Sequence, residues 1–141
     1  QKSQSSHCPK LFINKFKSQV SWYELDMEKM AKAYQQSHIA IIPTAFAEGT
    51  SLSCLEAMAT NNGIIATNIG GLPNLVLNNF NGMLINPDAR SLTNAVERLI
   101  ADRKLLKTLA SNALSTANSF RKEQWDLKWG SIIEEHLLVN Y

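Results

Sequence analysis

Two glutamates, Glu48 and Glu56, are the only charged side chains between Ala33 and Pro87. A carboxylate accepts hydrogen bonds from hydroxyl groups, and such charge-assisted bonds are about twice as strong as bonds between neutral groups. Two carboxylates in a segment otherwise free of charge could therefore bind a ligand that carries several hydroxyls. The cis-diol of a ribose is one group of this kind.

A second set of residues could bind an anion through the backbone. The segment Gly49–Leu52 leads into a predicted helix, whose first N–H groups and positive dipole end favour anionic oxygens. Gly70-Gly71 follows the next predicted strand and allows a close backbone approach at the same edge of the sheet. A nucleotide sugar would suit this place, because it has hydroxyls for the carboxylates and a diphosphate for the amides.

Each of these residues also has a purely structural interpretation. Glu48 could complement the dipole of the following helix, which is worth about 0.3–1 kcal/mol. Glu56 taken alone would be a solvated helix residue, and Gly70-Gly71 taken alone would indicate only a turn. The combination of two acids, a helix start and a glycine turn at one sheet edge is what favours a binding site.

Short apolar runs alternate with helical periodicity along the chain. This alternation predicts an α/β fold, a Rossmann-like parallel sheet with helices on both faces. Strands without charge suit such a sheet, because both of its faces are covered. The predicted strands are Val20–Tyr23, His38–Ile42, Ile64–Thr67 and Gly82–Ile85.

Caps and apolar spacing mark the predicted helices. Asp26 is the expected N-cap of the first helix, and a helix over Ser51–Thr60 is followed by Asn61, which tolerates left-handed backbone geometry. Helical spacing resumes at Ser91, and Asp102 is the expected cap of the next helix. We expect the last helix to pack in the core or at a domain interface through an apolar series: Trp125, Trp129, Ile132, Ile133 and Leu137.

Composition excludes several classes of protein. The 141 residues are 45% hydrophobic and 18% charged, an ordinary composition for one globular domain. The net charge of +2 is too small to indicate nucleic-acid binding. Cys8 and Cys54 match no metal or redox spacing, so we expect no metal site and a reducing compartment. No segment approaches the roughly 20 apolar residues of a membrane span.

The segment EGTSLSCLEAMA, Glu48–Ala59, closely resembles the Glu-x7-Glu signature of the retaining GT-B glycosyltransferases of group 1. AYQQSHIAIIPT resembles the segment that precedes this signature in the family. IIATNIGGLPNLV and NNFNGMLINPDARSLTNAVERLIAD resemble the strands, loops and helix that follow it. The resemblance runs in unbroken order over roughly residues 20–120.

In that family the C-terminal Rossmann-like domain binds a nucleotide-sugar donor. The resemblance implies that Glu48 acts at the reacting end of the donor sugar and that Glu56 accepts the ribose hydroxyls. Trp22, Tyr23 and Leu25 correspond to the segment that contacts the nucleobase. The remaining donor-binding positions are Gly49, Thr50, Ser51, Leu52, Gly70 and Gly71.

The same resemblance implies transfer of the sugar with retention, in which the leaving diphosphate takes the acceptor's proton on the same face. It implies a UDP-, GDP- or ADP-sugar as donor, no cofactor and no metal. The acceptor is a saccharide or a lipid-linked molecule, bound by an N-terminal domain that this chain lacks. The family most often assembles polysaccharides or glycolipids on the cytoplasmic side of a membrane, so we expect a cytoplasmic protein and leave a peripheral membrane contact open.

The sequence departs from the family in several ways. Thr50 and Ser51 stand where many members have Phe-Gly, and Asn74 replaces the common acid. The Arg/Lys pair that neutralises the diphosphate has no candidate in the charge-free segment. We therefore divide the chain into a poorly defined segment, residues 1–19, and a donor-binding domain over residues 20–141 that is incomplete at its N-terminal side. We expect no turnover from this chain alone.

Two other interpretations remain open. The chain could belong to a relative with the same fold and site but different chemistry, such as an epimerase or phosphorylase of the GT-B type. It could also be a non-catalytic or truncated module that retains the fold but binds no donor. Loss of the basic pair favours the second alternative, whereas retention of both Glu48 and Glu56 argues against it.

Overall fold

The computed structural model describes residues 19, 21, 23–46 and 49–137. Within them, three strands form one parallel sheet in the order β1–β2–β3, and Ile65 of the central strand pairs with Ile41 on one side and Met83 on the other. This confirms the predicted α/β, Rossmann-like parallel sheet. The strands are β1 (Ile39–Ile42), β2 (Gly63–Thr67) and β3 (Met83–Ile85).

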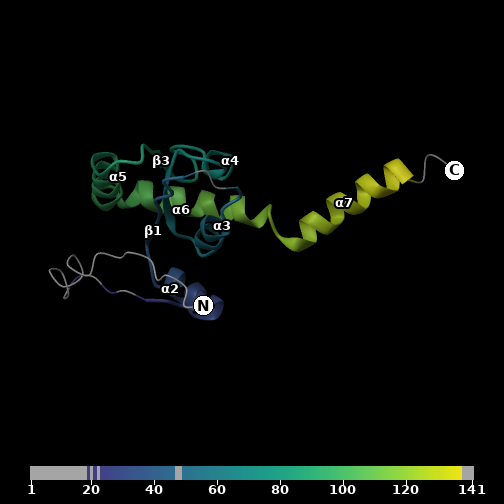
Figure 1. The fold of residues 1–141 in the computed structure, drawn as a ribbon, viewed down its shortest axis with the longest axis horizontal. Helices are drawn as coiled ribbons and strands as arrows, with labels where there is room; N and C mark the ends of the chain where they lie inside the picture. The colour runs from purple at the N-terminus through teal and green to yellow at the C-terminus, as the bar shows by residue number, and fades with distance from the viewer. Residues whose placement is uncertain (1–18, 20, 22, 47–48, 138–141) are drawn as a thin grey trace, which may run out of the picture.

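Helices follow each strand and precede the first (Figure 1). They are α2 (Met27–Gln35), α3 (Leu52–Ala59), α4 (Leu72–Leu75), α5 (Ala89–Ala101), α6 (Arg103–Asn118) and α7 (Lys122–Leu137). The one-turn helix α4 was not expected from the sequence, which indicated only a turn there. It begins directly after the glycine pair and has a proline in its first turn, where a missing N–H costs no helical hydrogen bond.

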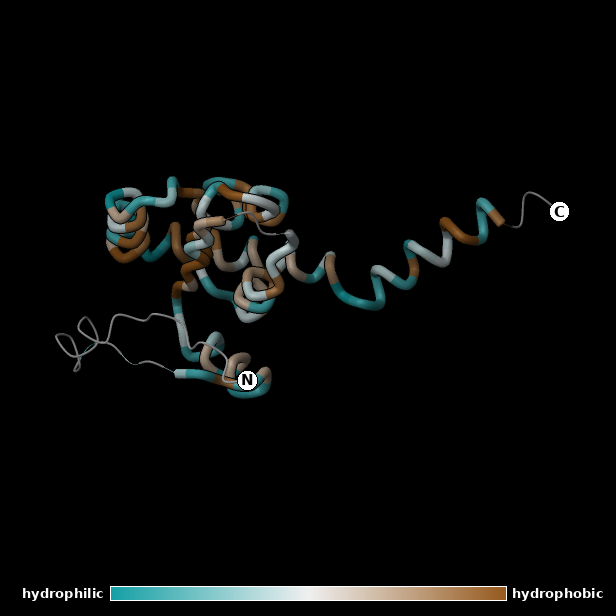
Figure 2. The backbone as a smooth tube through the Cα atoms, in the orientation of Figure 1, coloured by the Kyte–Doolittle hydropathy of each residue, from teal (hydrophilic) through white to brown (hydrophobic). Residues whose placement is uncertain are grey.

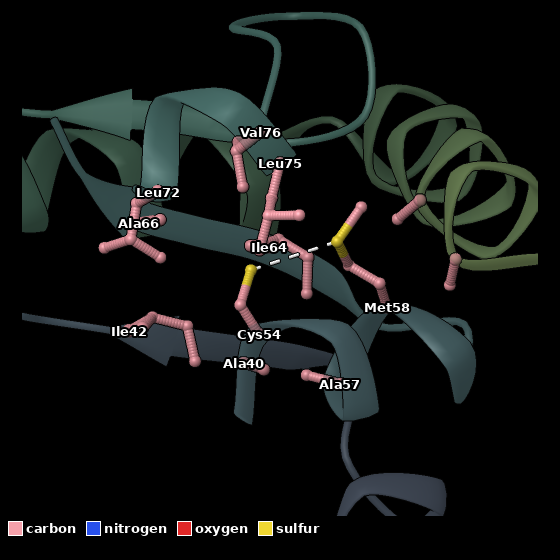
Figure 3. Packing of buried hydrophobic residues seen from close by; sticks show 12 residues of the cluster. Ala40, Ile42, Cys54, Ala57, Met58, Ile64, Ala66, Leu72, Leu75 and Val76 are labelled. Carbon is pink, nitrogen blue, oxygen red and sulfur yellow. Dashed lines mark hydrogen bonds between the residues drawn. The ribbon is translucent and has the colours of Figure 1, made fainter. Parts of the chain in front are cut away.

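Side chains of the central strand alternate between two apolar clusters, one on each face of the sheet. Ile64 and Ala66 belong to a cluster with α3, α4 and the end of α6, and Figure 3 shows Cys54 and Met58 of α3 in this packing. Ile65 belongs to the other cluster, with α5 and the start of α6. All residues of β2 are buried, which explains why this segment carries no charge.

Helix α6 joins the two layers. Its first half contributes Leu106 and Leu109 to the cluster on one face, and its second half contributes Ala113 and Ala117 to the cluster on the other. Leu106 lies over the first residue of β2, Gly63, where an added Cβ would collide with its side chain. The helix therefore crosses the sheet at the amino ends of the strands.

The predicted helix caps are largely confirmed. Asp26 and Asp102 each accept a hydrogen bond of 2.9 Å from the backbone N–H three residues later. Asn61 has a φ of 62°, the left-handed geometry expected after α3. Asp88 caps α5, which consequently begins at Ala89, earlier than the helical spacing indicated.

The predicted strand Val20–Tyr23 is not found in the part that can be examined. Ser21 and Tyr23 are irregular, and Val20 and Trp22 lie outside the described residues. The division of the chain at residue 19 therefore stays a prediction.

Helix α7 does not pack in the core. It runs away from the sheet (Figure 1), and none of its residues is buried in the described structure. Trp125 and Trp129 are 60% and 47% exposed, and their rings contact each other with centroids 5.8 Å apart. Figure 2 shows hydrophobic and hydrophilic stretches alternating along this helix. The expectation of core packing for α7 is wrong for the described residues.

Candidate functional site

The loops that leave β1 and β2 meet at the carboxyl edge of the sheet, where open α/β folds bind their ligands. A hydrogen bond joins them: the hydroxyl of Thr67, the last residue of β2, donates to the backbone carbonyl of Thr44 at 2.6 Å. Thr67 is 2% exposed, so this bond is shielded from water. It fixes the start of the first loop against the end of the neighbouring strand.

A second contact joins the same two loops further along. Gly70 has a φ of 58°, a left-handed conformation that favours glycine. This turn brings Gly71 against the backbone of Gly49, and a Cβ at position 71 would lie 2.8 Å from the Gly49 carbonyl carbon and 3.4 Å from the Thr50 nitrogen. The structure thus brings together the glycine pair and the residues that begin the α3 segment.

The N-terminus of α3 is presented at this edge. Ser51 is its N-cap, is 1% exposed, and accepts a hydrogen bond through Oγ from the Cys54 N–H at 3.4 Å. The next N–H groups, of Leu52 and Ser53, belong to the first turn and have no acceptor within the helix. Thr50 and Leu52 are exposed, so a ligand can reach the start of the helix.

Glu56 lies on the exposed face of α3, one turn beyond Ser53. We expected it at the border of the core and directed away from bulk solvent, so this placement corrects the sequence-based prediction. Burial, together with the nearby Glu56 carboxylate, raises the pKa of the Tyr34 hydroxyl, whereas a hydrogen bond with Ser53 acts in the opposite direction. The Glu56 carboxylate therefore lies close to the Tyr34 hydroxyl contributed by α2.

Other predicted site residues are less completely placed. Glu48 and Trp22 lie outside the described residues, so the distance between the two glutamates is not part of the described geometry. Tyr23 is 69% exposed and Leu25 is half-buried, both just before α2. Helix α2 packs against α3, which puts this segment on the same side of the domain as Glu56.

Two features of this edge were missed by the sequence reasoning. One is the hydrogen-bonded pair Thr67 and Thr44, for which the only sequence signal was a hydroxyl residue at the end of a buried strand. The other is a cavity of about 190 Å³ beside the carboxyl ends of all three strands. It is smaller than the roughly 300–1,000 Å³ of typical ligand sites. The cavity is lined by Pro43, Ala45, Thr67, Ile85, Asn86, Pro87, Asp88, Ala89 and Leu92.

Metal and membrane features were examined over the same residues. In the described ranges, no three His, Cys, Asp or Glu side chains come together as a metal site. No helix among them has the length and apolar character needed to cross a bilayer. Neither observation bears on residues outside those ranges.

Comparison with known proteins identifies the family. The family model described as "Glycosyl transferases group 1" matches residues 14–116. An uncharacterized glycosyltransferase of Methanocaldococcus jannaschii is 28% identical over 126 residues, which are 84% of this chain and 35% of that protein. The chain thus spans about a third of this curated relative.

Solved structures show the same fold. Sucrose-phosphate synthase from Thermosynechococcus elongatus matches with a TM-score of 0.79 and 26% identity, over 93% of this chain and 34% of that one. HepE from Anabaena, solved in complex with UDP, matches with a TM-score of 0.63 and 25% identity, over 71% of this chain and 29% of that one. The resemblance to group 1 glycosyltransferases is therefore confirmed at the level of family and fold.

Proposed function

The chain belongs to the group 1 glycosyl transferases, and we propose that it forms the donor-binding part of a retaining enzyme. This enzyme would transfer a sugar from a nucleoside diphosphate to a saccharide or lipid-linked acceptor. The observation that carries the proposal is the contact between Gly71 and Gly49, which holds the start of α3 beside the glycine turn at the carboxyl edge of the sheet.

In this proposal the diphosphate binds at the N-terminus of α3. The N–H groups of Leu52 and Ser53 point out of the first turn, and the helix dipole adds positive potential there. Ser51 Oγ already accepts the Cys54 N–H, so its contribution is to hold the helix start in place. Gly70 and Gly71 shape the opposite wall through their backbone, because no side chain projects from either.

Glu56 is the proposed ribose ligand. It is exposed on α3 and near the Tyr34 hydroxyl, so two neighbouring hydroxyls of a ribose could donate to its carboxylate. Charge-assisted bonds of this kind contribute about 1.5–3 kcal/mol. Glu48, eight positions earlier, is proposed to bind hydroxyls of the donor sugar at the reacting carbon.

The proposed reaction proceeds with retention of the anomeric configuration. The bond between the anomeric carbon and the diphosphate oxygen breaks while the acceptor hydroxyl forms a new bond on the same face. The acceptor's proton passes to the departing diphosphate. Glu48 positions the sugar, and the amides of Leu52 and Ser53 stabilise charge that develops on the leaving group.

UDP is the first donor nucleotide to test, because the structural neighbour HepE was solved with UDP; GDP and ADP follow. Acceptor binding and the cations that neutralise the diphosphate would come from parts of the parent protein outside this chain, which spans about a third of its relatives. We therefore propose that this chain alone binds donor without turnover. A cytoplasmic role in polysaccharide assembly, with or without a peripheral membrane contact, completes the proposal.

Saturation-transfer NMR tests the donor site directly. UDP, GDP, ADP and their common sugar conjugates would be titrated into the chain and into Glu56→Ala and Glu56→Gln. We expect one nucleotide to bind, and both variants to weaken it roughly tenfold or more, since each removes the negative charge that accepts the hydroxyls. Glu97→Ala, an exposed glutamate on α5, is the matched control.

Equal nucleotide affinity in the wild type and Glu56→Ala would overturn the ribose assignment. Acceptor-dependent release of nucleoside diphosphate by the full-length parent would distinguish a transferase from a non-catalytic module. Release without net sugar transfer to an acceptor would instead favour the epimerase or phosphorylase alternative.

A further inference from the structure

A groove lies at the amino ends of the strands, on the side of the sheet opposite the candidate donor site. Its volume is about 740 Å³, within the usual range for small-molecule sites. The ends of α2 and α3 form one wall, and one face of α6 forms the other. The lining residues are Gln35, Gln36, Ser37, His38, Thr60, Asn61, Arg103, Leu106, Lys107, Ala110, Ser111 and Leu114.

The charged side chains of this groove are all of one sign. Arg103 and Lys107 line it from α6, and no aspartate or glutamate is among the lining residues. Positions four apart on a helix lie on one face with Cβ atoms about 5–6 Å apart. Neither cation forms an ion pair within the described part of the chain. Two adjacent cations without a carboxylate partner favour an anionic ligand.

A structural alternative for these cations is to satisfy the helix ends that face them, since basic side chains often bind carbonyls at helix C-termini. Those carbonyls already have partners. Tyr34 O accepts from the Ser37 N–H at 3.0 Å and from Asn62 Nδ2 at 2.9 Å. Met58 O accepts from the Asn61 N–H at 3.1 Å. The two cations are therefore not needed as caps for these carbonyls.

The nearest acid in sequence does not neutralise the groove either. Asp102 directly precedes Arg103, but its carboxylate accepts the Leu105 N–H as the cap of α6, and it does not line the groove. The start of α6 adds the positive end of a helix dipole beside Arg103. His38 stands at the entrance to β1 and supplies a further nitrogen.

The remainder of the lining suits a small polar molecule. Leu106, Ala110 and Leu114 form an apolar floor, and side-chain amides and hydroxyls surround it. We propose that this groove is a second ligand site, which binds a phosphate monoester with its phosphate at Arg103 and Lys107. The ester's polar body lies over the floor and bonds to Asn61 and Ser111.

This site is separate from the candidate donor site. The strand β2 runs from Gly63, under Leu106 at the groove side, to Thr67 at the donor edge. At a rise of about 3.3 Å per residue the two edges lie roughly 13–15 Å apart. A ligand in the groove would therefore leave the donor edge free, and the two sites can be observed independently.

Two-dimensional ¹H–¹⁵N NMR of the chain tests the proposal, with glucose 6-phosphate as probe and glucose as its uncharged counterpart. We expect glucose 6-phosphate to shift the amide signals of His38, Asn61 and Ser111 in a saturable manner, and glucose to shift them far less. Lys107→Gln should weaken binding about tenfold or more, because it removes one charge-assisted bond. Lys104→Gln, an exposed lysine of α6 that does not line the groove, should leave the affinity unchanged.

A second variant tests the cavity rather than the charge. Ser111→Trp adds bulk at an exposed position of the groove and keeps both cations, so it should abolish the shifts while the rest of the spectrum is retained. Equal affinity in the wild type, Lys107→Gln and Ser111→Trp would overturn the proposal. Shifts confined to Gly49–Leu52 and Gly71 would also overturn it, because they would place the phosphate at the donor edge.

A phosphate monoester can be a free metabolite or a lipid headgroup, and sedimentation with vesicles distinguishes them. Vesicles of phosphatidylcholine with phosphatidic acid would be compared with vesicles of phosphatidylcholine alone. Binding to the former that Lys107→Gln removes and Lys104→Gln retains assigns the groove to a lipid headgroup. Soluble binding without vesicle binding assigns it to a free phosphate ester. Failure of both arms overturns the site and leaves the proposed donor function unaffected.

Discussion

Gly71 lies so close to Gly49 that a Cβ at position 71 would stand 2.8 Å from the Gly49 carbonyl carbon. The two residues belong to different loops, one after β1 and one after β2. The contact makes these loops one unit at the carboxyl edge of the sheet. Glycine is required at position 71 because any side chain there would push the start of α3 away from the neighbouring strand.

We expect Gly71→Ala to destabilise the fold by about 1–3 kcal/mol, the usual cost of inserting a methyl group into a filled space. Urea unfolding monitored by circular dichroism measures this change. Gly49→Ala is the control, because a Cβ there would meet nothing within 4 Å. Similar unfolding midpoints for the two variants would contradict the close approach.

The hydroxyl of Thr67 supports the first loop through its bond to Thr44 O. Thr67→Val keeps the shape of the side chain and leaves a carbonyl without this donor, so we expect a loss of about 1 kcal/mol. Thr93→Val, on the exposed face of α5, removes a hydroxyl that bonds only to its own helix at Ala89 O and is the matched control. Amide exchange near Thr44 should become faster only in the first variant. Unchanged exchange there would show that the bond does not hold the loop.

The cap of α5 makes its stability depend on pH. Hydrogen bonds from the backbone N–H and the hydroxyl of Ser91 lower the pKa of Asp88. Because the folded-state pKa lies below the unfolded one, this contribution is present above the unfolded value of 3.8 and is lost as pH falls through the folded value. We expect amides in the first turn of α5 to exchange faster below about pH 4, after correction for the intrinsic rate.

Asp88→Asn separates this effect from general acid denaturation, because asparagine can cap a helix but does not titrate. The variant should show no such acceleration in the first turn of α5. If wild type and Asp88→Asn respond alike between neutral pH and pH 3, the carboxylate of Asp88 is not the group responsible.

Helix α7 contributes little to the stability of the domain. None of its residues is buried in the described structure, so removal of residues 122–141 should leave the urea midpoint nearly unchanged. Leu109→Ala should by comparison cost about 2–5 kcal/mol, because Leu109 is fully buried. A deletion as damaging as Leu109→Ala would show that α7 packs on the domain in solution.

Several features of this protein follow from local sequence alone. The runs at His38–Ile42 and Ile64–Thr67 are free of charge because both faces of a parallel sheet are covered, and they became β1 and β2 within one residue of the predicted bounds. The caps Asp26 and Asp102 and the left-handed Asn61 were also predicted, because each depends on neighbours within one helical turn. The family could be recognised because its signature is one continuous segment.

Other features were decided only by the tertiary structure. The contact of Gly71 with Gly49 and the bond from Thr67 to Thr44 join residues more than 20 positions apart, and no local pattern encodes such distances. The exposure of Glu56 depends on what packs beside α3, and that of Trp125 on whether α7 meets the sheet. The basic groove needs α6 to cross the amino ends of the strands. Local chemistry thus determined the elements and the residues able to bind a donor, whereas packing between distant segments determined which of them meet.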